Sequence, residues 1–418
     1  MLTTDENDFL CRVGPGTPMG EAMRRFWWPV LLSQELPVPD SDPILIRLLG
    51  QNFVAFRDTE GRVGILDEYC CHRGASLVIG RVEDCGIRCL YHGWKFAVDG
   101  RLQDAPNVAS LTILDRVRQP AYPVHEEAGV VWTYIGPSEE QPPFRHLIWM
   151  GAPASHRAVT AGLSRFNYLA AVENAIDSSH LTILHRDSIL EAPRFANGEP
   201  LHMPPVDSVP PQMEVEETDF GLYYAAMRDS ENVEGAVSTW ARVAAAVLPT
   251  TMFIPPGFCN MIVPVDDQTT LNIAVNFNLD TEVTQWPPSW DAFPSLYSKV
   301  PGRLVAVSKM AAENRYMQDR ESMRKGSFAG FPGRLAQEDN ALLTAMGAYP
   351  SRAMEHVVPA DLGVLKVRRQ LSDLAGEVAR GELAHAARAD VTTIRDHEGP
   401  IDSTRPWQKL IPEMASLP

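Results

Sequence analysis

Short apolar runs separated by turn residues dominate the first third of the chain. The runs are rich in β-branched and aromatic residues, and turn signals that contain Asp and Gly at 58–61 and 99–100 divide them, which is typical of short antiparallel strands. A short helix precedes them, because Thr17 suits an N-cap and Pro18 suits the first helical position. The pattern predicts a compact antiparallel β domain with strands that include 44–49, 53–56 and 130–135.

Longer elements follow a polar, proline-rich segment at 137–143, which indicates a linker. Beyond it, helical and strand-like spacings of apolar residues predict a larger α+β region. We therefore expect an α+β fold with an N-terminal helical segment at 1–27, a β domain at 28–140 and a larger domain at 141–418. The stretch 392–418 has weak periodicity, and we expect it to wrap over the surface or to be partly disordered. The expected helices are 168–184, 305–317 and 362–388, and the expected strands are 221–227, 242–248 and 271–279.

The composition argues against several classes of protein. The 418 residues carry a formal net charge of −16, whereas nucleic-acid binding needs a basic surface. The acidic N-terminus lacks the apolar stretch of a signal peptide, and the most apolar stretch, 243–258, is interrupted by prolines and is too short to span a membrane. Six cysteines, two of them assigned below to iron, leave no disulfide framework. We therefore expect a cytoplasmic protein that binds neither nucleic acid nor a membrane.

A split cysteine–histidine motif is the strongest chemical signal in the chain. Cys70 and His72 form its first half, and Cys89 and His92 form the second. Two thiolates and two imidazoles in this order are the ligands of a Rieske [2Fe–2S] cluster, in which two Cys bind one iron and two His bind the other. Structural zinc sites also use two Cys and two His, but usually as a Cys pair followed by a His pair. A glycine just after each His favours tight loops around a cluster, so the motif predicts a redox protein.

Two further cysteines lie close to this motif. Cys71 adjoins Cys70, and the side chains of neighbouring residues usually point apart, so only one of the two is expected to face the metal. The spacing favours Cys70, which leaves Cys71 as a loop or core residue. Cys85 is expected to be a small buried hydrophobic residue.

A second group of potential metal ligands begins at Asp177. His180 lies three residues on, so the carboxylate can hydrogen-bond the imidazole on one helix face. His185 lies five residues beyond His180, about 140° around a regular helix, so the helix must end or be distorted between them if both bind one metal. Two histidines and an aspartate near a helix end are, by themselves, more often helix caps and core residues. The Rieske motif favours an iron site here, because its cluster needs an acceptor for its electrons. Two His and one carboxylate bind Fe(II) in oxygen-activating enzymes, and the residues themselves leave four carboxylates open: Asp319, Glu321, Glu338 and Asp339.

Together these residues resemble the oxygenase (alpha) component of Rieske non-haem iron aromatic ring-hydroxylating oxygenases, and specifically the phthalate 4,5-dioxygenase family. The resemblance covers nearly the whole chain. The chain departs from the family at Cys71, where proline is usual, and in a short stretch after 104–106, and neither change removes a ligand. The similar segments are the two halves of the Cys–His motif together with 11–20, 49–50, 54–58, 173–185, 318–321, 338–347 and 355–356.

The resemblance implies a Rieske domain followed by a helix-grip-like catalytic domain with a central antiparallel sheet. It implies a [2Fe–2S] Rieske cluster and a mononuclear Fe(II) bound by His180, His185 and Asp339. Asp177 would connect that iron with a Rieske histidine of the neighbouring subunit, in a homotrimer or a stacked hexamer. The sequence contains no G-x-G-x-x-G nucleotide motif, so we expect a separate NAD(P)H-dependent reductase with flavin and iron–sulfur centres. The remaining partners are O2 and a small aromatic substrate.

The expected substrate depends on a few polar residues. Arg228 and Arg242 lie on otherwise apolar expected strands, where a guanidinium can bind a carboxylate through two hydrogen bonds. Ser178, beside the iron motif, can donate to a substrate oxygen. The alternative explanations are a structural ion pair or an outward-facing strand position for each arginine, and an ordinary helix hydroxyl for Ser178. We expect hydroxylation of an aromatic carboxylate such as phthalate, phenoxybenzoate or chlorobenzoate. The alternatives are a demethylase or monooxygenase of methoxylated aromatics, and an electron-transfer Rieske protein without oxygenase activity.

Overall fold

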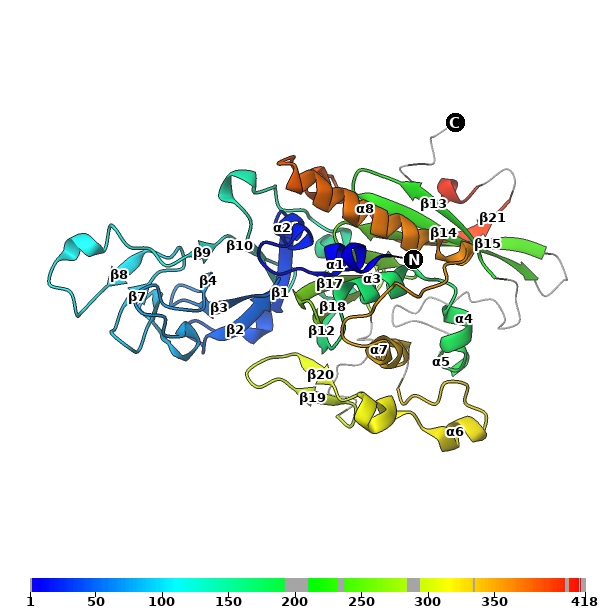
Figure 1. Cartoon of the computed structure of the whole chain (residues 1–418), viewed down its shortest axis with the longest axis horizontal. Coiled ribbons are helices and arrows are strands. Elements are labelled where there is room, and N and C mark those ends of the chain that lie inside the picture. The colour runs from blue at the N-terminus through cyan, green and yellow to red at the C-terminus, as the bar shows by residue number, and fades with distance from the viewer. Residues whose placement is uncertain are drawn as a thin grey trace.

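The computed structural model describes residues 2–191, 210–231, 237–283, 294–333, 335–402, 406–412 and 414. A β-rich N-terminal part and a larger part with helices and a wide sheet lie side by side, which confirms the α+β class (Figure 1). The helices are α1 (Thr4–Cys11), α2 (Pro18–Met23), α3 (Tyr168–Ile176), α4 (Leu181–Leu184), α5 (Arg186–Glu191), α6 (Arg320–Arg324), α7 (Leu335–Ala345) and α8 (Leu362–Ala379).

The β-rich part contains two four-stranded antiparallel sheets. Strand β2 alternates buried and exposed residues, as expected for a sheet with one face on a core. A small separate core lies under the metal-motif loops and includes Phe56, Cys70, Cys89 and Phe96. One sheet consists of β2 (Ile44–Leu48), β3 (Gln51–Arg57), β4 (Val63–Asp67) and β9 (Ala121–Tyr122), and the other of β5 (Arg81–Glu83), β6 (Gly86–Arg88), β7 (Lys95–Phe96) and β8 (Leu102–Asp104).

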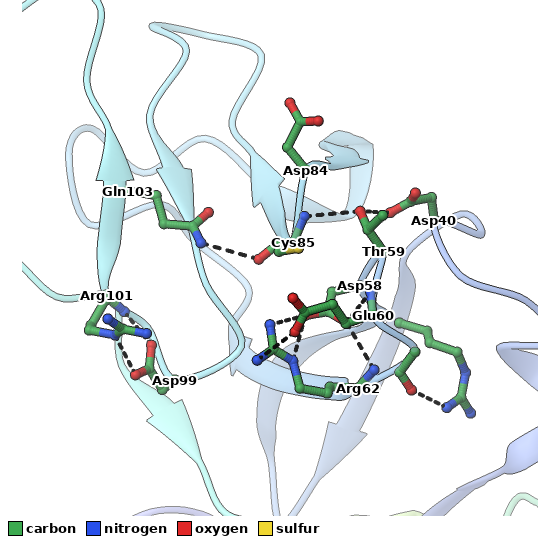
Figure 2. Close-up of polar contacts among 12 residues, drawn as sticks. Asp40, Asp58, Thr59, Glu60, Arg62, Asp84, Cys85, Asp99, Arg101 and Gln103 are labelled. Atoms are coloured by element: carbon green, nitrogen blue, oxygen red, sulfur yellow. Dashed lines mark hydrogen bonds and ion pairs between the residues drawn. The ribbon is translucent and has the colours of Figure 1, made fainter.

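Figure 2 shows the hairpin turn between β5 and β6, where Cys85 lies. Asp84 and Cys85 have φ angles of 47° and 61°, the left-handed conformation that two-residue hairpin turns require. The backbone N–H of Cys85 donates to Oγ1 of Thr59 at 2.9 Å, and its carbonyl accepts from Gln103 at 3.3 Å. The expectation that Cys85 is buried is therefore wrong, because the tight turn places it, half-exposed, at the tip of a hairpin.

A three-stranded sheet joins the two parts of the molecule. Its strands are β1 (Trp27–Leu32), β11 (Val130–Tyr134) and β10 (Val124–Glu127), so the chain enters and leaves the β-rich part on adjacent strands. The backbone N–H groups of Leu49 and Gly50 donate to carbonyls of the large sheet at 2.9 Å, which adds a second connection. The domain boundaries expected after residues 27 and 140 stay a prediction.

The larger part is built on a ten-stranded sheet that is antiparallel except where β12 meets β20. β21 pairs with β15, so the expectation of a tail lying over the surface or disordered is wrong at this strand; 403–405, 413 and 415–418 lie outside the described residues. The strands are β12 (Arg157–Ser164), β13 (Gln212–Glu217), β14 (Gly221–Glu231), β15 (Val237–Val247), β16 (Thr251–Ile254), β17 (Phe258–Asp266), β18 (Thr269–Phe277), β19 (Tyr297–Lys299), β20 (Ala306–Ser308) and β21 (His397–Ile401).

All three expected helices differ from those in the structure, and two of them lie away from the candidate iron site. The segment 305–317 forms β20 and then a 3₁₀ turn at Ala312–Met317, because hydrogen bonding to the large sheet overrides its helical spacing. The segment 362–388 is α-helical only to the end of α8, and Gly381 follows with a φ of 77°, as is usual after a helix C-terminus. A short 3₁₀ helix at His385–Arg388 ends the segment.

Helix α3 is fixed by a buried ion-pair network. The carboxylate of Glu173 accepts two hydrogen bonds from Arg352, at 2.6 and 2.7 Å, and one from Arg368 of α8, at 2.6 Å. Arg368 also donates two bonds to Glu355. The N-terminal segment joins the same packing, because the Tyr168 hydroxyl donates to a carbonyl of α1 at 2.6 Å. Segments far apart in sequence thus hold the helix that leads into the candidate iron site.

The start of α8 packs against the end of α3 without space for a side chain at Gly363. A Cβ atom there would lie 2.5 Å from Cγ2 of Ile176, the residue directly before Asp177. We expect Gly363→Ala to lower the free energy of unfolding by about 1–3 kcal/mol despite the better helix propensity of alanine, because overpacking strains a filled core. Urea unfolding followed by circular dichroism measures this.

The matched control for this variant is Gly376→Ala on the same helix. A Cβ at position 376 meets only the flexible guanidinium end of Arg380, at 3.3 Å. This variant should be as stable as the wild type or more stable by up to about 1 kcal/mol. Equal stability of the two variants would contradict the close-packing argument.

Candidate metal centres

The two halves of the Cys–His motif form loops of the same construction. In each, the glycine four residues after the cysteine donates its N–H to the cysteine carbonyl: Gly74 to Cys70 at 2.8 Å, and Gly93 to Cys89 at 3.0 Å. The φ angles of the two glycines are 72° and 78°, a conformation that suits glycine. The tight turns expected after each histidine are therefore present.

The side chains of the motif converge at the tips of these loops. Cys70 and Cys89 have exposed fractions of 3% and 2%. The rings of His72 and His92 lie 4.5 Å apart, and the indole of Trp94 stacks on His72 at 4.3 Å. Burial, together with the adjacent Cys89, raises the pKa of the Cys70 thiol to about 11, so a bound cation is needed to hold this sulfur as a thiolate. Two buried sulfurs beside two imidazoles fit a Rieske cluster.

Cys71 lies outside this group. Its side chain is exposed, and its backbone N–H donates to Oε1 of Gln119 at 2.8 Å, which fixes the loop with Cys70 directed inward. Of the two adjacent cysteines, Cys70 is therefore buried and Cys71 exposed. That Cys70 is the one that faces the metal stays a prediction.

We expect Cys70→Ser to lose the cluster and Cys71→Ser to keep it, because only the Cys70 sulfur lies in the buried group. Iron and acid-labile sulfide content, visible absorption and the EPR spectrum of the reduced protein measure this. A Cys71→Ser protein without a cluster, or a Cys70→Ser protein with the wild-type spectrum, would contradict the ligand assignment.

The chain bends sharply between the candidate iron ligands. Helix α3 ends at Ile176, and Asp177 follows in an extended conformation, accepting hydrogen bonds from the N–H and hydroxyl of Ser179 at 2.7 and 2.5 Å. His180 and His185 lie at the two ends of the single helical turn α4. The expected single helix 168–184 is therefore wrong, because it is broken at 177–180. The helix end expected between the two histidines falls after Leu184, where α4 stops before His185. Oδ2 of Asp177 still lies 3.4 Å from Nδ1 of His180, through the turn instead of a helix face.

Asp339 of α7 meets both histidines. Its Oδ1 lies 3.0 Å from Nε2 of His185 and 3.6 Å from Nε2 of His180, and one ligand atom from each residue lies within 4.8 Å of the other two. Oδ1 of Asp339 and Nε2 of His185 are buried and have no hydrogen-bond partner among the described residues. A metal ion between them would satisfy both atoms, so the group fits a mononuclear iron bound by two His and one carboxylate.

The other three candidate carboxylates have different partners. Asp319 caps α6 by accepting from two backbone N–H groups, at 2.8 and 3.0 Å. Glu321 pairs with Lys325 on the surface. Glu338 lies on the opposite side of the His185 ring, with Oε2 2.7 Å from Nδ1. Among these four carboxylates, the structure brings Asp339 to both histidines.

The charges at this centre are closely coupled. Burial opposes ionisation of Asp339, but His185, His180 and a hydrogen bond from Asn174 hold the pKa of its carboxyl below the usual range. Burial likewise disfavours a charged His185, yet Asp339 and Glu338 outweigh it and raise the pKa of His185 to about 9. The protein therefore concentrates negative charge where a divalent cation would bind.

A cavity of about 300 Å³ opens onto His180, His185 and Asp339. Ser178 and Arg242, two of the expected substrate residues, line it. Most of the lining is apolar, as in binding sites for small aromatic molecules. Amides that the sequence did not single out also line the cavity, and no sequence signal beyond their place on strands or near the iron motif marks them: Asn174, Asn260, Asn272 and Asn340.

The two expected substrate arginines lie on the same face of neighbouring strands but differ in position. Arg242 on β15 lines the cavity, donates to the carbonyl of Pro255 and lies 3.6 Å from Glu398. Arg228 on β14 is not part of the cavity wall and donates to the Ser178 carbonyl at 2.7 Å. Burial and the nearby Arg242 lower the pKa of Arg228 to about 10. Arg242 is the better placed of the two for a ligand in the cavity.

Comparison with known proteins agrees with this architecture. Residues 26–121 match the Rieske [2Fe-2S] domain, and residues 133–415 match the family described as LigXa C-terminal domain like. The phthalate 4,5-dioxygenase oxygenase subunit of Pseudomonas putida is 37% identical, covering 92% of this chain and 88% of that protein. The 3-chlorobenzoate-3,4-dioxygenase oxygenase subunit of Comamonas testosteroni is 34% identical, covering 92% and 91%.

Solved structures share the fold at low sequence identity. NdmA of Pseudomonas putida CBB5, in complex with theobromine, has a TM-score of 0.61 at 17% identity, covering 92% of this chain and 99% of that chain. The oxygenase of carbazole 1,9a-dioxygenase in complex with ferredoxin has a TM-score of 0.55 at 18% identity, covering 88% and 92%. Among the described residues, none of the helices combines the length and apolar character needed to cross a membrane.

A Rieske domain followed by a helix-and-sheet catalytic domain defines an aromatic ring-hydroxylating oxygenase with a [2Fe–2S] cluster and a mononuclear iron. The chain belongs to the Rieske non-haem iron oxygenases, as an oxygenase component of the phthalate 4,5-dioxygenase family.

Proposed function

We propose that this oxygenase hydroxylates a small aromatic carboxylate, such as a phthalate, phenoxybenzoate or chlorobenzoate, at an iron bound by His180, His185 and Asp339. The observation that carries the proposal is the approach of these three side chains at one end of a largely apolar cavity that also exposes Arg242. The relatives named for phthalate and 3-chlorobenzoate support the substrate class.

The residues of the site have distinct tasks. When bound, the iron supplies oxygen activation with electrons from the Rieske cluster. The two imidazoles direct Nε2 toward Asp339, which leaves their Nδ1 atoms to the carboxylates of Asp177 and Glu338. The apolar lining excludes water from the reacting face of the substrate. Ser178, in the cavity wall next to the turn, can donate to a substrate oxygen.

Asp177 is the proposed link to the electron donor. One of its oxygens faces His180 and the other is held by Ser179, and 27% of the side chain is exposed, so a histidine of another subunit can reach it. Strands β7 and β8, next to the cluster loops, lie at one end of the molecule in Figure 1, and helix α4 lies in the other half. This separation supports electron transfer from the cluster of a neighbouring subunit, in a trimer or a stacked hexamer.

The surface around the cluster supports docking by other proteins. Four large apolar or aromatic side chains flank the metal loops with exposed fractions of 56–69%, which is unusual for an isolated surface. One face of this tip would meet the neighbouring subunit, and a separate flavin- and iron–sulfur-containing reductase that oxidises NAD(P)H would reduce the cluster. The four residues are Tyr69, Ile79, Leu90 and Tyr91.

Arg242 is the proposed anchor for the substrate carboxylate. Its guanidinium is buried, so a charge-assisted hydrogen bond to a ligand is not weakened by competing water. Its contacts to Glu398 and the Pro255 carbonyl orient the group.

Demethylation of a methoxylated aromatic is the second candidate. The 5,5'-dehydrodivanillate O-demethylase oxygenase subunit of Sphingobium sp. (strain NBRC 103272 / SYK-6) is 28% identical over 91% of this chain and 82% of that protein. Formaldehyde release from methoxybenzoates, measured with a reductase present, distinguishes this outcome from ring hydroxylation.

We expect His180→Ala to abolish product formation while the reduced cluster keeps its EPR signal, because the mutation removes an iron ligand but leaves the Rieske loops intact. Product analysis by liquid chromatography on a benzoate panel measures the first, and EPR the second. Full turnover by this variant would contradict the proposed iron site.

We expect Arg242→Gln to raise the KM for a carboxylate substrate about 10- to 100-fold, since a hydrogen bond to a charged group contributes about 1.5–3 kcal/mol. The KM for the matching neutral amide analogue should change little. Arg228→Gln is the matched control, because Arg228 is similarly buried on the adjacent strand but does not line the cavity. The KM of the Arg228→Gln enzyme for the carboxylate substrate should rise less than that of Arg242→Gln. Equal effects on the charged and neutral substrates in Arg242→Gln would remove the anchoring role.

A further inference from the structure

Glu338 and Asp339 are consecutive residues of α7 that contact opposite edges of one imidazole. Successive side chains on a helix diverge by about 100°, so the pair can reach around the ring of His185. Oδ1 of Asp339 lies 3.0 Å from Nε2, and Oε2 of Glu338 lies 2.7 Å from Nδ1. The helix therefore holds both nitrogen atoms of this histidine at once.

The contact between Glu338 and His185 is shielded from solvent. Their exposed fractions are 4% and 0%, so water does not compete for the hydrogen bond. A metal ion binds an imidazole in its neutral form, and with the ion at Nε2 the carboxylate of Glu338, which accepts but does not donate, holds the remaining proton on Nδ1. The lone pair of Nε2 is then directed at Asp339, where the iron ligands converge.

His180 has a different environment. Its Nδ1 lies 3.4 Å from Asp177, a partly exposed carboxylate that is also held by Ser179. The shorter and fully buried contact belongs to His185. A carboxylate thus orients each histidine. Asp177, beside His180, is partly exposed to solvent, whereas Glu338, beside His185, is buried.

We propose that Glu338 is a positioning residue that fixes the tautomer and ring orientation of His185 and increases the affinity of the site for Fe(II). A carboxylate behind a metal-binding histidine makes the imidazole a stronger donor, and loss of such a group typically costs 10- to 100-fold in metal affinity. The proposal rests on the proposed iron site and adds a residue that does not itself bind the metal.

The test compares Fe(II) binding by the full-length protein with its cluster in place. Mononuclear iron is removed by chelation, Fe(II) is titrated back anaerobically, and the bound fraction is read from the EPR signal formed with nitric oxide. Glu338→Ala should bind Fe(II) 10- to 100-fold more weakly than the wild type. Glu338→Gln should recover most of this loss, because its amide oxygen accepts the same bond from Nδ1. The rhombicity of the nitric oxide signal should also differ in Glu338→Ala, since the His185 ring is no longer fixed.

Gln337→Ala is the matched control. Gln337 is equally buried on the same helix, and its amide donates to the Tyr297 hydroxyl at 3.0 Å. This variant should bind Fe(II) within a few-fold of the wild type, with an unchanged nitric oxide signal. The visible spectrum of the cluster reports folding in every variant. If Glu338→Ala does not fold, the Fe(II) affinity of Glu338→Asp, whose shorter side chain withdraws the oxygen from Nδ1, replaces it and should be lower than that of Glu338→Gln.

The possible failures are distinguishable. Wild-type affinity and an unchanged nitric oxide signal in Glu338→Ala would overturn the positioning role, as would an equal loss of affinity in Gln337→Ala. A wild-type protein that binds no Fe(II) and gives no nitric oxide signal would overturn the iron site itself, and with it the proposed function.

Discussion

The catalytic half of this molecule depends on bringing two histidines and a carboxylate from distant parts of the chain to one point. A regular helix cannot do this for His180 and His185, because their spacing places them on different faces. The chain meets the constraint by limiting α4 to the single turn Leu181–Leu184, so that the two histidines cap its ends and His185 leaves the helical conformation. Helix α7 then supplies Asp339 from the opposite side.

That arrangement requires a rigid support, and the buried ion pairs around Glu173 provide it. Arg352 and Arg368 both bind this carboxylate, which ties the last turns of α3 to α8 and to the segment that follows α7. Removal of one partner from such a network leaves a buried charge uncompensated, which lowers the free energy of unfolding. At the same place, the close contact between Gly363 and Ile176 leaves no space for a larger side chain at position 363. Packing of distant segments thus sets the position at which Asp177 leaves the helix.

The sequence predicts the parts whose chemistry is local. The Cys–His motif, the choice of Cys70 over Cys71 and the interruption near His180 follow from spacing and turn chemistry alone. The choice of Asp339 does not, because Glu338 is its neighbour and only the direction of each side chain around His185 separates the proposed ligand from the proposed supporting group.

Other features depend on tertiary pairing that no local pattern encodes. Residues 306–308 become a strand because β12 and β19 lie beside them. Residues 397–401 become a strand because they pair with 239–243 of β15, the stretch that β16 leaves uncovered. Likewise, apolar neighbours in the sequence do not distinguish Arg242 from Arg228. Their difference arises from the cavity, which the sheet, α3 and α7 form together.

Anomalous X-ray diffraction at the iron edge, from crystals of the full-length protein, locates both metal centres in one experiment. We expect two iron positions in each chain: a two-iron cluster among Cys70, His72, Cys89 and His92, and a single iron among Nε2 of His180, Nε2 of His185 and the carboxylate of Asp339. A map with no iron at the second position from iron-replete protein, or with zinc at the first, would contradict this expectation.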